Sequence, residues 1–155
     1  MAVQIRPPAA ADHDQWADLY REYAHDYPVG DEILDRVWSW ILDVDHEVEA
    51  LVAEDTAGHL VGLAHFRAFA RPVLGTYGGY LDDLYVSPAA RGTGLADAFL
   101  NRLGAIGVER GWSVIRWNTA EANYRARAKY DKFAKRSADR VQYDMELEVR
   151  QTPPK

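Results

Sequence analysis

Residues 87–100 read SPAARGTGLADAFL. From Leu95 onwards the apolar spacing is that of an amphipathic helix, but Gly92 and Gly94 stand where this helix should begin. Glycine disfavours a helix by about 1 kcal/mol relative to alanine. A glycine-rich turn between a strand and a helix is, however, a common anion site, because backbone N–H groups and the helix dipole meet there. The stretch therefore predicts an anion-binding turn, with a plain tight turn as the alternative.

Three known phosphate-binding patterns can be tested on this turn. The P-loop requires G-x-x-x-x-G-K-[ST], which nothing after Gly94 supplies. The dinucleotide fingerprint G-x-G-x-x-G requires a glycine at position 97, which is Asp97. The pattern [QR]-x-x-G-x-[GA] fits at every fixed position from Arg91 to Ala96, here called the glycine turn. This match predicts that the glycine turn binds a pyrophosphate.

A second motif lies about 30 residues further along the chain, within a basic helix expected at 121–136. Asn123, Ala126 and Tyr130 form N-x-x-A-x-x-x-Y. Seven residues make almost two helical turns, so the first and last of these lie on one face. With one predicted strand between them, the two motifs resemble those of the GCN5-related N-acetyltransferase (GNAT) superfamily.

The remaining patterns agree with the fold that this resemblance implies. Helical spacing predicts helices at about 12–23, 34–41, 93–110 and 121–136. Alternating and β-branched stretches predict strands at 3–5, 47–54, 60–69, 80–86, 112–118 and 140–149, with a loop at 71–79. We therefore expect an α/β fold of the α+β type, in which helices flank a mixed, mostly antiparallel sheet with one parallel pair. Residues 1–150 are expected to form one domain, with a flexible tail at 151–155.

Composition narrows the classes of function. The net charge of −6, from 24 acids and 18 bases, argues against a general nucleic-acid binder. The negative charge is compatible with a cationic substrate; the alternative is that it only keeps the protein soluble. There are no cysteines, which excludes disulfides and a cysteine nucleophile, and the histidines lack metal-ligand spacing, so no metal is expected. With no long apolar run and no signal core, no membrane partner is expected and the predicted location is cytoplasmic.

The resemblance implies an enzyme that moves the acetyl group of acetyl-CoA to a primary amine. Tyr130 matches the family's acid for the departing thiolate, with packing or a hydrogen bond to the sulfur as the alternative. Asn123 either contacts the pantetheine arm or caps the basic helix. The implied coenzyme A-binding residues are Leu84, Tyr85, Val86, Arg91, Gly92, Thr93, Gly94, Leu95, Ala96, Asn123 and Tyr130.

Two adjacent acids, Asp82 and Asp83, are the candidates for proton transfer and acceptor binding. Adjacent strand residues face opposite sides, so both reach one cleft only if the strand bulges. Asp82 is expected to be the base or to order a water, and Asp83 to bind the substrate cation or a backbone group; a solvated or structural role is the alternative for each. The pair resembles that of diamine and polyamine acetyltransferases, which favours a polyamine, diamine or lysine-like acceptor. Further substrate candidates beside the break after the first helix are Tyr27, Asp31 and Glu32.

Two adjacent positions depart from the family pattern, and other functions are open alternatives. Ala134 and Lys135 stand where the family has Gly-Phe, so Phe133 is expected to take the core place of that phenylalanine. The competing functions are acetylation of protein N-termini or antibiotic amines, and a coenzyme A-binding sensor or interaction module without catalysis. Many family members are dimers, so a homodimer is an open alternative to a monomer.

Overall fold

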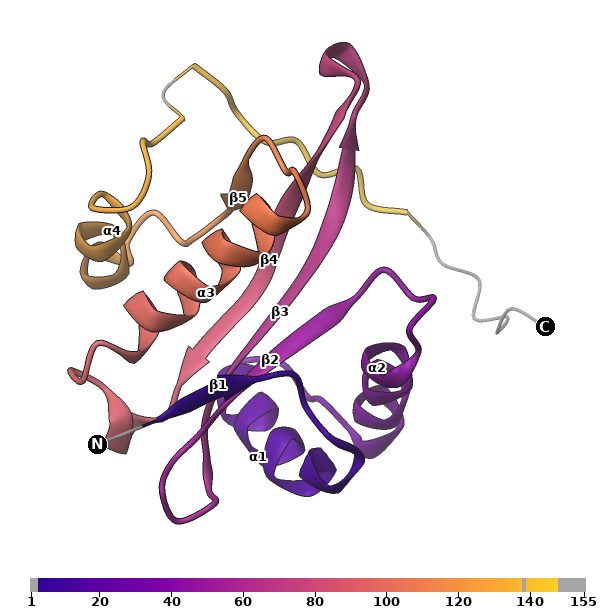
Figure 1. Ribbon diagram of the computed structural model, residues 1–155, viewed down its shortest axis with the longest axis vertical. Helices are drawn as coiled ribbons and strands as arrows, with labels where there is room; N and C mark the ends of the chain where they lie inside the picture. Colours follow the sequence, from indigo (N-terminus) through magenta and orange to yellow (C-terminus); the bar gives the residue numbers. More distant parts are fainter. Residues whose placement is uncertain (1–2, 138, 148–155) are drawn as a thin grey trace.

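The computed structural model describes residues 3–137 and 139–147. Along the chain the elements are β1 (Gln4–Arg6), α1 (His13–Tyr23), α2 (Asp31–Leu42), β2 (Glu49–Glu54), β3 (Leu60–Arg71), β4 (Thr76–Val86), α3 (Leu95–Glu109), β5 (Ile115–Trp117) and α4 (Tyr124–Tyr130). The strands lie in the order β1-β2-β3-β4-β5, and every neighbouring pair is antiparallel except β4 and β5 (Figure 1). The predicted mixed α/β fold with one parallel pair is confirmed.

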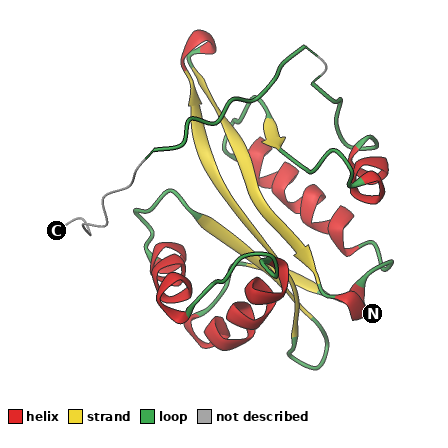
Figure 2. Ribbon diagram, turned by 180° about the vertical axis from the view of Figure 1, so that it is seen from behind, coloured by secondary structure: helices red, strands yellow, loops and turns green. Residues whose placement is uncertain are grey.

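The helices cover both faces of the sheet, as Figures 1 and 2 show from opposite sides. On one face Trp16 of α1 and Leu34 of α2 pack with Val52 and Leu63 of the sheet. On the other face α3 packs against the sheet through residues such as Phe99. None of the described helices is long and apolar enough to cross a bilayer.

The segment 71–79 is not the loop that the sequence predicted. β3 and β4 run through most of it as a long hairpin, broken only by a 3-10 turn at Pro72–Leu74 and by Gly75 in the left-handed conformation. Pro72 and Gly75 signal a turn but do not show how tight it is. The ring of Trp112 lies where a side chain on residue 79 would collide with it, so glycine at this position lets the segment between α3 and β5 approach the sheet.

β4 and β5 pair over only three positions, from Gly79–Ile115 to Leu81–Trp117. β5 then ends, whereas β4 continues to Val86. Within the described ranges, no strand pairs with the outer edge of β4 beyond Leu81. The parallel pair therefore opens into a gap at its carboxyl end, the edge at which ligands commonly bind in sheets with parallel strands.

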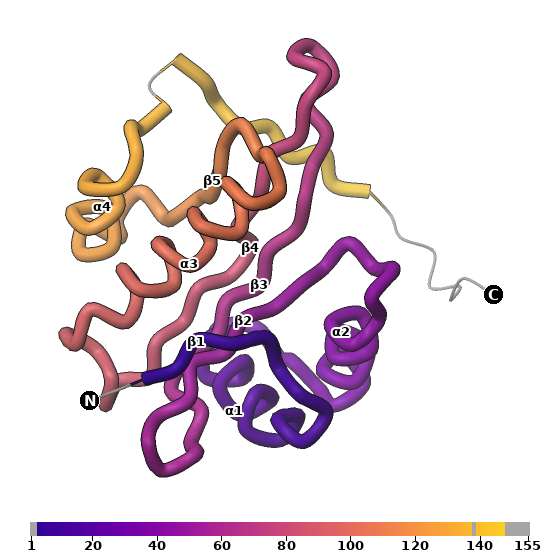
Figure 3. The backbone as a smooth tube through the Cα atoms, in the orientation of Figure 1, coloured from indigo at the N-terminus to yellow at the C-terminus, as the bar shows by residue number. Residues whose placement is uncertain are grey.

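The C-terminal part differs most from expectation. α4 ends at Tyr130 rather than near 136, and Phe133 is 39% exposed instead of packing in the core. Residues 141–147 form no strand and follow α4 as an irregular segment (Figure 3). A strand needs a ladder partner, and no backbone hydrogen bond within the described residues reaches this segment, so its alternating apolar side chains are exposed. Residues 148 and 149 of the predicted strand, and the predicted tail at 151–155, lie outside the described residues.

Candidate functional site

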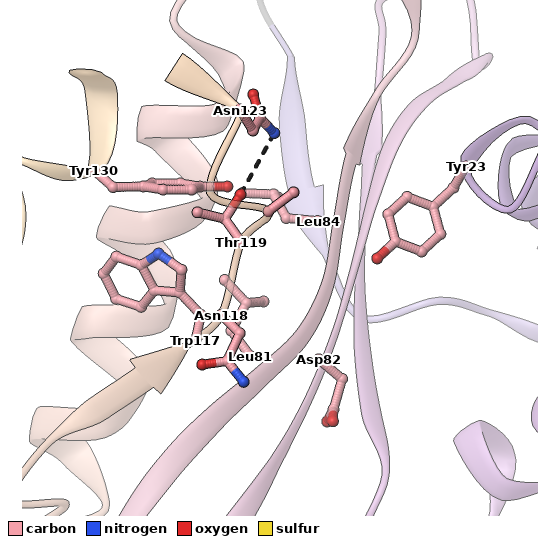
Figure 4. Close-up of a pocket in the computed structure, with 10 residues that line it drawn as sticks. Tyr23, Leu81, Asp82, Leu84, Trp117, Asn118, Thr119, Asn123 and Tyr130 are labelled. Carbon is pink, nitrogen blue, oxygen red and sulfur yellow. Dashed lines mark hydrogen bonds between the residues drawn. The ribbon is translucent and has the colours of Figure 1, made fainter. Parts of the chain in front are cut away.

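A pocket of about 410 Å³ lies where β4 and β5 separate (Figure 4). It is lined by Leu81, Asp82, Leu84, Trp117, Asn118, Thr119, Ala120, Asn123, Tyr130 and Tyr23. In Figure 4, Tyr130 and Asn123 lie on one side of β4 and Asp82 and Tyr23 on the other. The pocket thus gives access to both sides of the sheet, and it brings together four of the predicted site residues: Asp82, Leu84, Asn123 and Tyr130.

The hydroxyl of Tyr130 points into the pocket from α4 (Figure 4). Its ring packs edge-to-face on Trp117, with the ring centres 5.4 Å apart. Burial raises the pKa of Tyr130 above its ordinary value near 10, so the hydroxyl keeps its proton at neutral pH. Tyr130 therefore presents a protonated hydroxyl, held by the packing of its ring, on this side of the pocket.

Asn123 caps α4, as one of its two sequence interpretations expected. Its side-chain oxygen accepts a hydrogen bond from the backbone N–H of Ala126 at 3.2 Å. Its amide nitrogen, which has two N–H donors, donates to the hydroxyl of Thr119 at 3.4 Å (Figure 4). Capping uses only the oxygen, so an amide N–H is left to donate to a ligand in the pocket.

The glycine turn joins the end of β4 to the start of α3. Gly92 and Gly94 have φ angles of +83° and +85°, and a Cβ on either would meet nothing within 4 Å. In the described part of the chain no hydrogen-bond acceptor meets the backbone N–H groups of residues 92–97. Leu95 is buried and anchors the first turn of α3 in the core. The glycine turn, which the buried Leu95 holds in place, therefore presents unpaired backbone N–H donors at a helix N-terminus. Such donors fit the pyrophosphate of coenzyme A.

Neighbouring groups complete this cradle. The guanidinium of Arg91 donates to the carbonyl of Val86 at 3.1 Å and lies over the ring of Tyr85 at 5.8 Å. The hydroxyl of Thr93 donates to the carbonyl of Ala90 at 2.7 Å, which ties the turn to the preceding 3-10 turn. The positive charge of Arg91 is thus held against the end of β4, by a residue that directly precedes the open donors in the chain.

The predicted coenzyme-binding residues of β4 differ in what they can present. Leu84 contributes its side chain to the pocket. The side chain of Tyr85 lies towards α1, where its hydroxyl donates to Glu22 at 2.8 Å. Tyr85 and Val86 therefore have chiefly backbone groups to offer to a ligand along the outer edge of β4.

A bulge in β4 brings the two adjacent acids to one face. His65 of β3 pairs with Asp83 and Phe66 pairs with Leu81, so Asp82 is an extra residue without a partner. The carboxylate of Asp82 contacts Arg67 at 3.2 Å, and that of Asp83 contacts His65 at 2.8 Å. His65 and Arg67 are two residues apart on one strand and share a face, so both acids lie on the side covered by α1.

The two acids differ in their electrostatic environments. Burial raises the pKa of Asp82, and the ion pair with Arg67 only partly offsets this effect. Burial would also raise the pKa of Asp83, but hydrogen bonds from His65 and from the hydroxyls of Tyr20 and Tyr23 outweigh it and lower the pKa. Asp82 is thus the better proton acceptor of the two, while Asp83 stays ionised.

The other substrate candidates do not line this pocket. Tyr27 is 76% exposed. Asp31 and Glu32, in the first turn of α2, pair with Arg21 at 2.6 Å and with Arg36 at 3.2 Å. The structure does not bring these three residues to the gap between β4 and β5, and their role in substrate binding stays a prediction.

The sequence interpretation missed several residues of the pocket. Tyr23 is the last residue of the helix predicted at about 12–23, and its position opposite the gap depends on how α1 crosses the sheet. Asn118 is the last residue of the predicted strand at 112–118 and Thr119 follows it directly, and polar residues at the end of this strand could have been singled out.

Comparisons with known proteins agree with this geometry. Residues 14–134 match the family described as Acetyltransferase (GNAT) family. No curated protein matches the sequence significantly. Among solved structures, a ribosomal-protein-alanine N-acetyltransferase from Brucella melitensis biovar Abortus 2308 is 29% identical, with a TM-score of 0.76 and coverage of 94% of this chain and 100% of that chain.

Two aminoglycoside acetyltransferase structures share the fold at lower identity. The antibiotic 6′-N-acetyltransferase AAC(6′)-Ih from Acinetobacter baumannii is 16% identical, with a TM-score of 0.76, and the match covers 96% of this chain and 100% of that one. AAC(6′)-Iy, solved with a CoA bisubstrate analogue, is also 16% identical, with a TM-score of 0.80 and coverage of 95% and 99%. The family match spans most of the chain, and the fold and the glycine turn agree with it. The chain therefore belongs to the GNAT family and is an acetyl-CoA-dependent N-acetyltransferase.

Proposed function

We propose that this enzyme acetylates a primary amine of a small polycationic acceptor, such as a polyamine or diamine, or of a lysine-like side chain, by direct attack. The observation that supports this proposal is the bulge at Asp82, which places two carboxylates on the α1-facing side of the gap. Tyr23 also lines the pocket from that side. The carboxylate of Asp82 lines the pocket and attracts an ammonium ion, and the ionised Asp83 on the same face adds to the negative potential that favours a polycation.

The residues divide the work of binding between the two sides of the sheet. The glycine turn would hold the pyrophosphate of acetyl-CoA, and Arg91 would add positive charge. The amide of Asn123 and the outer edge of β4 would hold the pantetheine arm. When bound, acetyl-CoA supplies a thioester, which is an acetyl donor activated towards amines.

Two residues would move the protons. Asp82 accepts a proton from the acceptor ammonium, directly or through a water, so that the nitrogen lone pair becomes available. Tyr130 holds a proton at its hydroxyl oxygen and donates it to the departing sulfur. In the balance, an N–C bond forms and a C–S bond breaks. The ammonium nitrogen loses two protons: one goes to Asp82, and the other replaces the proton that Tyr130 gives to the sulfur.

The proposal is tested by kcat/KM for a panel of acceptors, with free thiol and acetylated product both measured. The panel comprises spermidine, putrescine, a lysine-containing peptide, an alanyl N-terminal peptide and an aminoglycoside. We expect the first three to give the highest values and Asp82→Asn to lower them. A clear preference for the alanyl peptide or the aminoglycoside would contradict the acceptor class. Coenzyme A binding without turnover of any amine would favour the non-catalytic sensor instead.

A further inference from the structure

His65 lies at the centre of a buried network that the proposed proton transfers do not use. It is 2% exposed, and its Nε2 lies 2.9 Å from the indole Nε1 of Trp16. An indole N–H can only donate, so Nε2 of His65 must be the acceptor and carries no proton. The imidazole proton therefore lies on Nδ1, which donates to Oδ2 of Asp83 at 2.8 Å.

Packing fixes the imidazole in this orientation. Trp16 is fully buried, and its ring lies 5.8 Å from the imidazole, centre to centre. The ring of Tyr20 meets the imidazole edge-on at 4.8 Å. A ring flip of His65 would bring carbon atoms to the positions of both ring nitrogens, so the indole N–H would lose its acceptor and Asp83 its donor. The surrounding aromatic rings and the hydrogen bonds therefore favour one state.

The fixed carboxylate of Asp83 in turn orients tyrosine hydroxyls. The hydroxyl of Tyr20 donates to Oδ2 of Asp83 at 3.4 Å. The ring of Tyr23 stacks on that of Tyr20 with the centres 6.0 Å apart, and its hydroxyl is near enough to this carboxylate to feel its charge. Burial and the charge of Asp83 raise the pKa of Tyr20 to about 12 and raise that of Tyr23 as well, so both keep their protons. A hydroxyl whose proton points to Asp83 turns its oxygen lone pairs to other donors, and Tyr23 lines the pocket.

We propose that His65, held by Trp16, is a positioning residue for the acceptor amine: it fixes Asp83 and, through it, orients the Tyr23 hydroxyl as a hydrogen-bond acceptor for the ammonium. The inference rests on the proposed function, because it assumes that the amine enters from the α1-facing side. His65 itself touches neither the amine nor acetyl-CoA. The network therefore acts on acceptor affinity and leaves coenzyme binding alone.

The first test is the tautomer of His65 in the full-length protein. In ¹⁵N-histidine-labelled enzyme, the proposal expects a protonated Nδ1 and an unprotonated Nε2, assigned by loss of the signal in His65→Asn. A proton on Nε2 would overturn it. This readout does not depend on activity.

The second test separates positioning from plain structural support by comparing two variants. His65→Asn keeps an N–H near the position of Nδ1, whereas His65→Leu fills the site without a donor. We expect His65→Leu to raise the KM for the amine about tenfold or more, with the KM for acetyl-CoA unchanged, and His65→Asn to restore most of the affinity. If the two variants have the same amine KM, or if both substrates are affected equally, the proposal is wrong.

A double-mutant cycle with Tyr23→Phe tests the connection itself. If His65 acts through Tyr23, the double variant should have an amine KM no higher than the worse single variant. Multiplicative effects would overturn the connection. Should His65→Leu fail to fold, Trp16→Phe takes its place, since losing the indole donor also frees the imidazole. If the wild-type enzyme acetylates no amine, the proposed function fails; if it does and only the variant pattern differs, the failure is that of His65 alone.

Discussion

Replacing Gly94 in the glycine turn with glutamate should weaken coenzyme binding, at a modest cost to the stability of the fold. Gly94 has a φ of +85°, and a Cβ there would meet nothing within 4 Å. The cost of Gly94→Ala is therefore the left-handed backbone alone, roughly 1–2 kcal/mol. For a chain of this length, that corresponds to a fall in Tm of about 2–8 °C.

Gly94→Glu adds a negative charge beside the site proposed for the pyrophosphate. Two like charges 4 Å apart near a protein surface repel by about 4 kcal/mol. Residue 94 is exposed, so solvent and salt screen part of this repulsion. We expect the Kd for coenzyme A to rise by about tenfold to a hundredfold, or about 1.4–2.8 kcal/mol.

Gly75 provides a matched control, because it too has a positive φ, +58°, with open space around it. It lies next to the start of β4, at the end of the strand away from the glycine turn, roughly 30 Å along the chain direction. Isothermal titration calorimetry of coenzyme A should give wild-type affinity for Gly75→Glu and weakened affinity for Gly94→Glu. Equal affinities in the two variants would refute the assignment of the glycine turn.

Three further outcomes are expected. Tyr130→Phe keeps the aromatic ring packed on Trp117, so the variant should lower kcat by about 10²–10⁴ with little change in coenzyme affinity. An unchanged kcat in steady-state assays would show that Tyr130 is not the acid. Because burial raises the pKa of Asp82, kcat/KM for the amine should fall as the pH drops towards that raised pKa. The pH profile of Asp82→Asn should lack this fall at low pH. If the fall persists in the variant, Asp82 is not the base. Arg6 lowers the pKa of Asp12 by hydrogen bonding, so the ionised carboxylate stabilises the fold at pH values above its unfolded-state pKa near 4, and this stabilisation is lost as the pH falls. Urea unfolding should show Asp12→Asn to be about 1–3 kcal/mol less stable than the wild type at pH 7. The difference in stability should disappear below about pH 4.

The sequence predicted the parts of the fold that local patterns determine. The glycine turn follows a strand and opens α3, and Gly111, with a φ of +69°, is the glycine that commonly ends a helix. Asn123 and Tyr130 share one side of the pocket because seven helical residues bring them onto one face. These features can be predicted from the spacing and type of residues that are close in the sequence.

Other features depend on partners distant in the sequence. The bulge at Asp82 appears only in the register of β4 against β3, and this register decided that both acids share a face. His65 stands alone in an apolar strand pattern, and its partner Trp16 is 49 residues away. The alternation in 141–147 predicted a strand, but period-two spacing does not tell whether a sheet edge is there to pair with it.

The most direct test of the account is the stoichiometry of one reaction. Purified enzyme is mixed with acetyl-CoA with and without spermidine, and free thiol and N-acetylated amine are quantified together. The account predicts thiol release that depends on the amine and equals the acetylated product one for one. Thiol release that is absent, or that proceeds at the same rate without the amine, would contradict it.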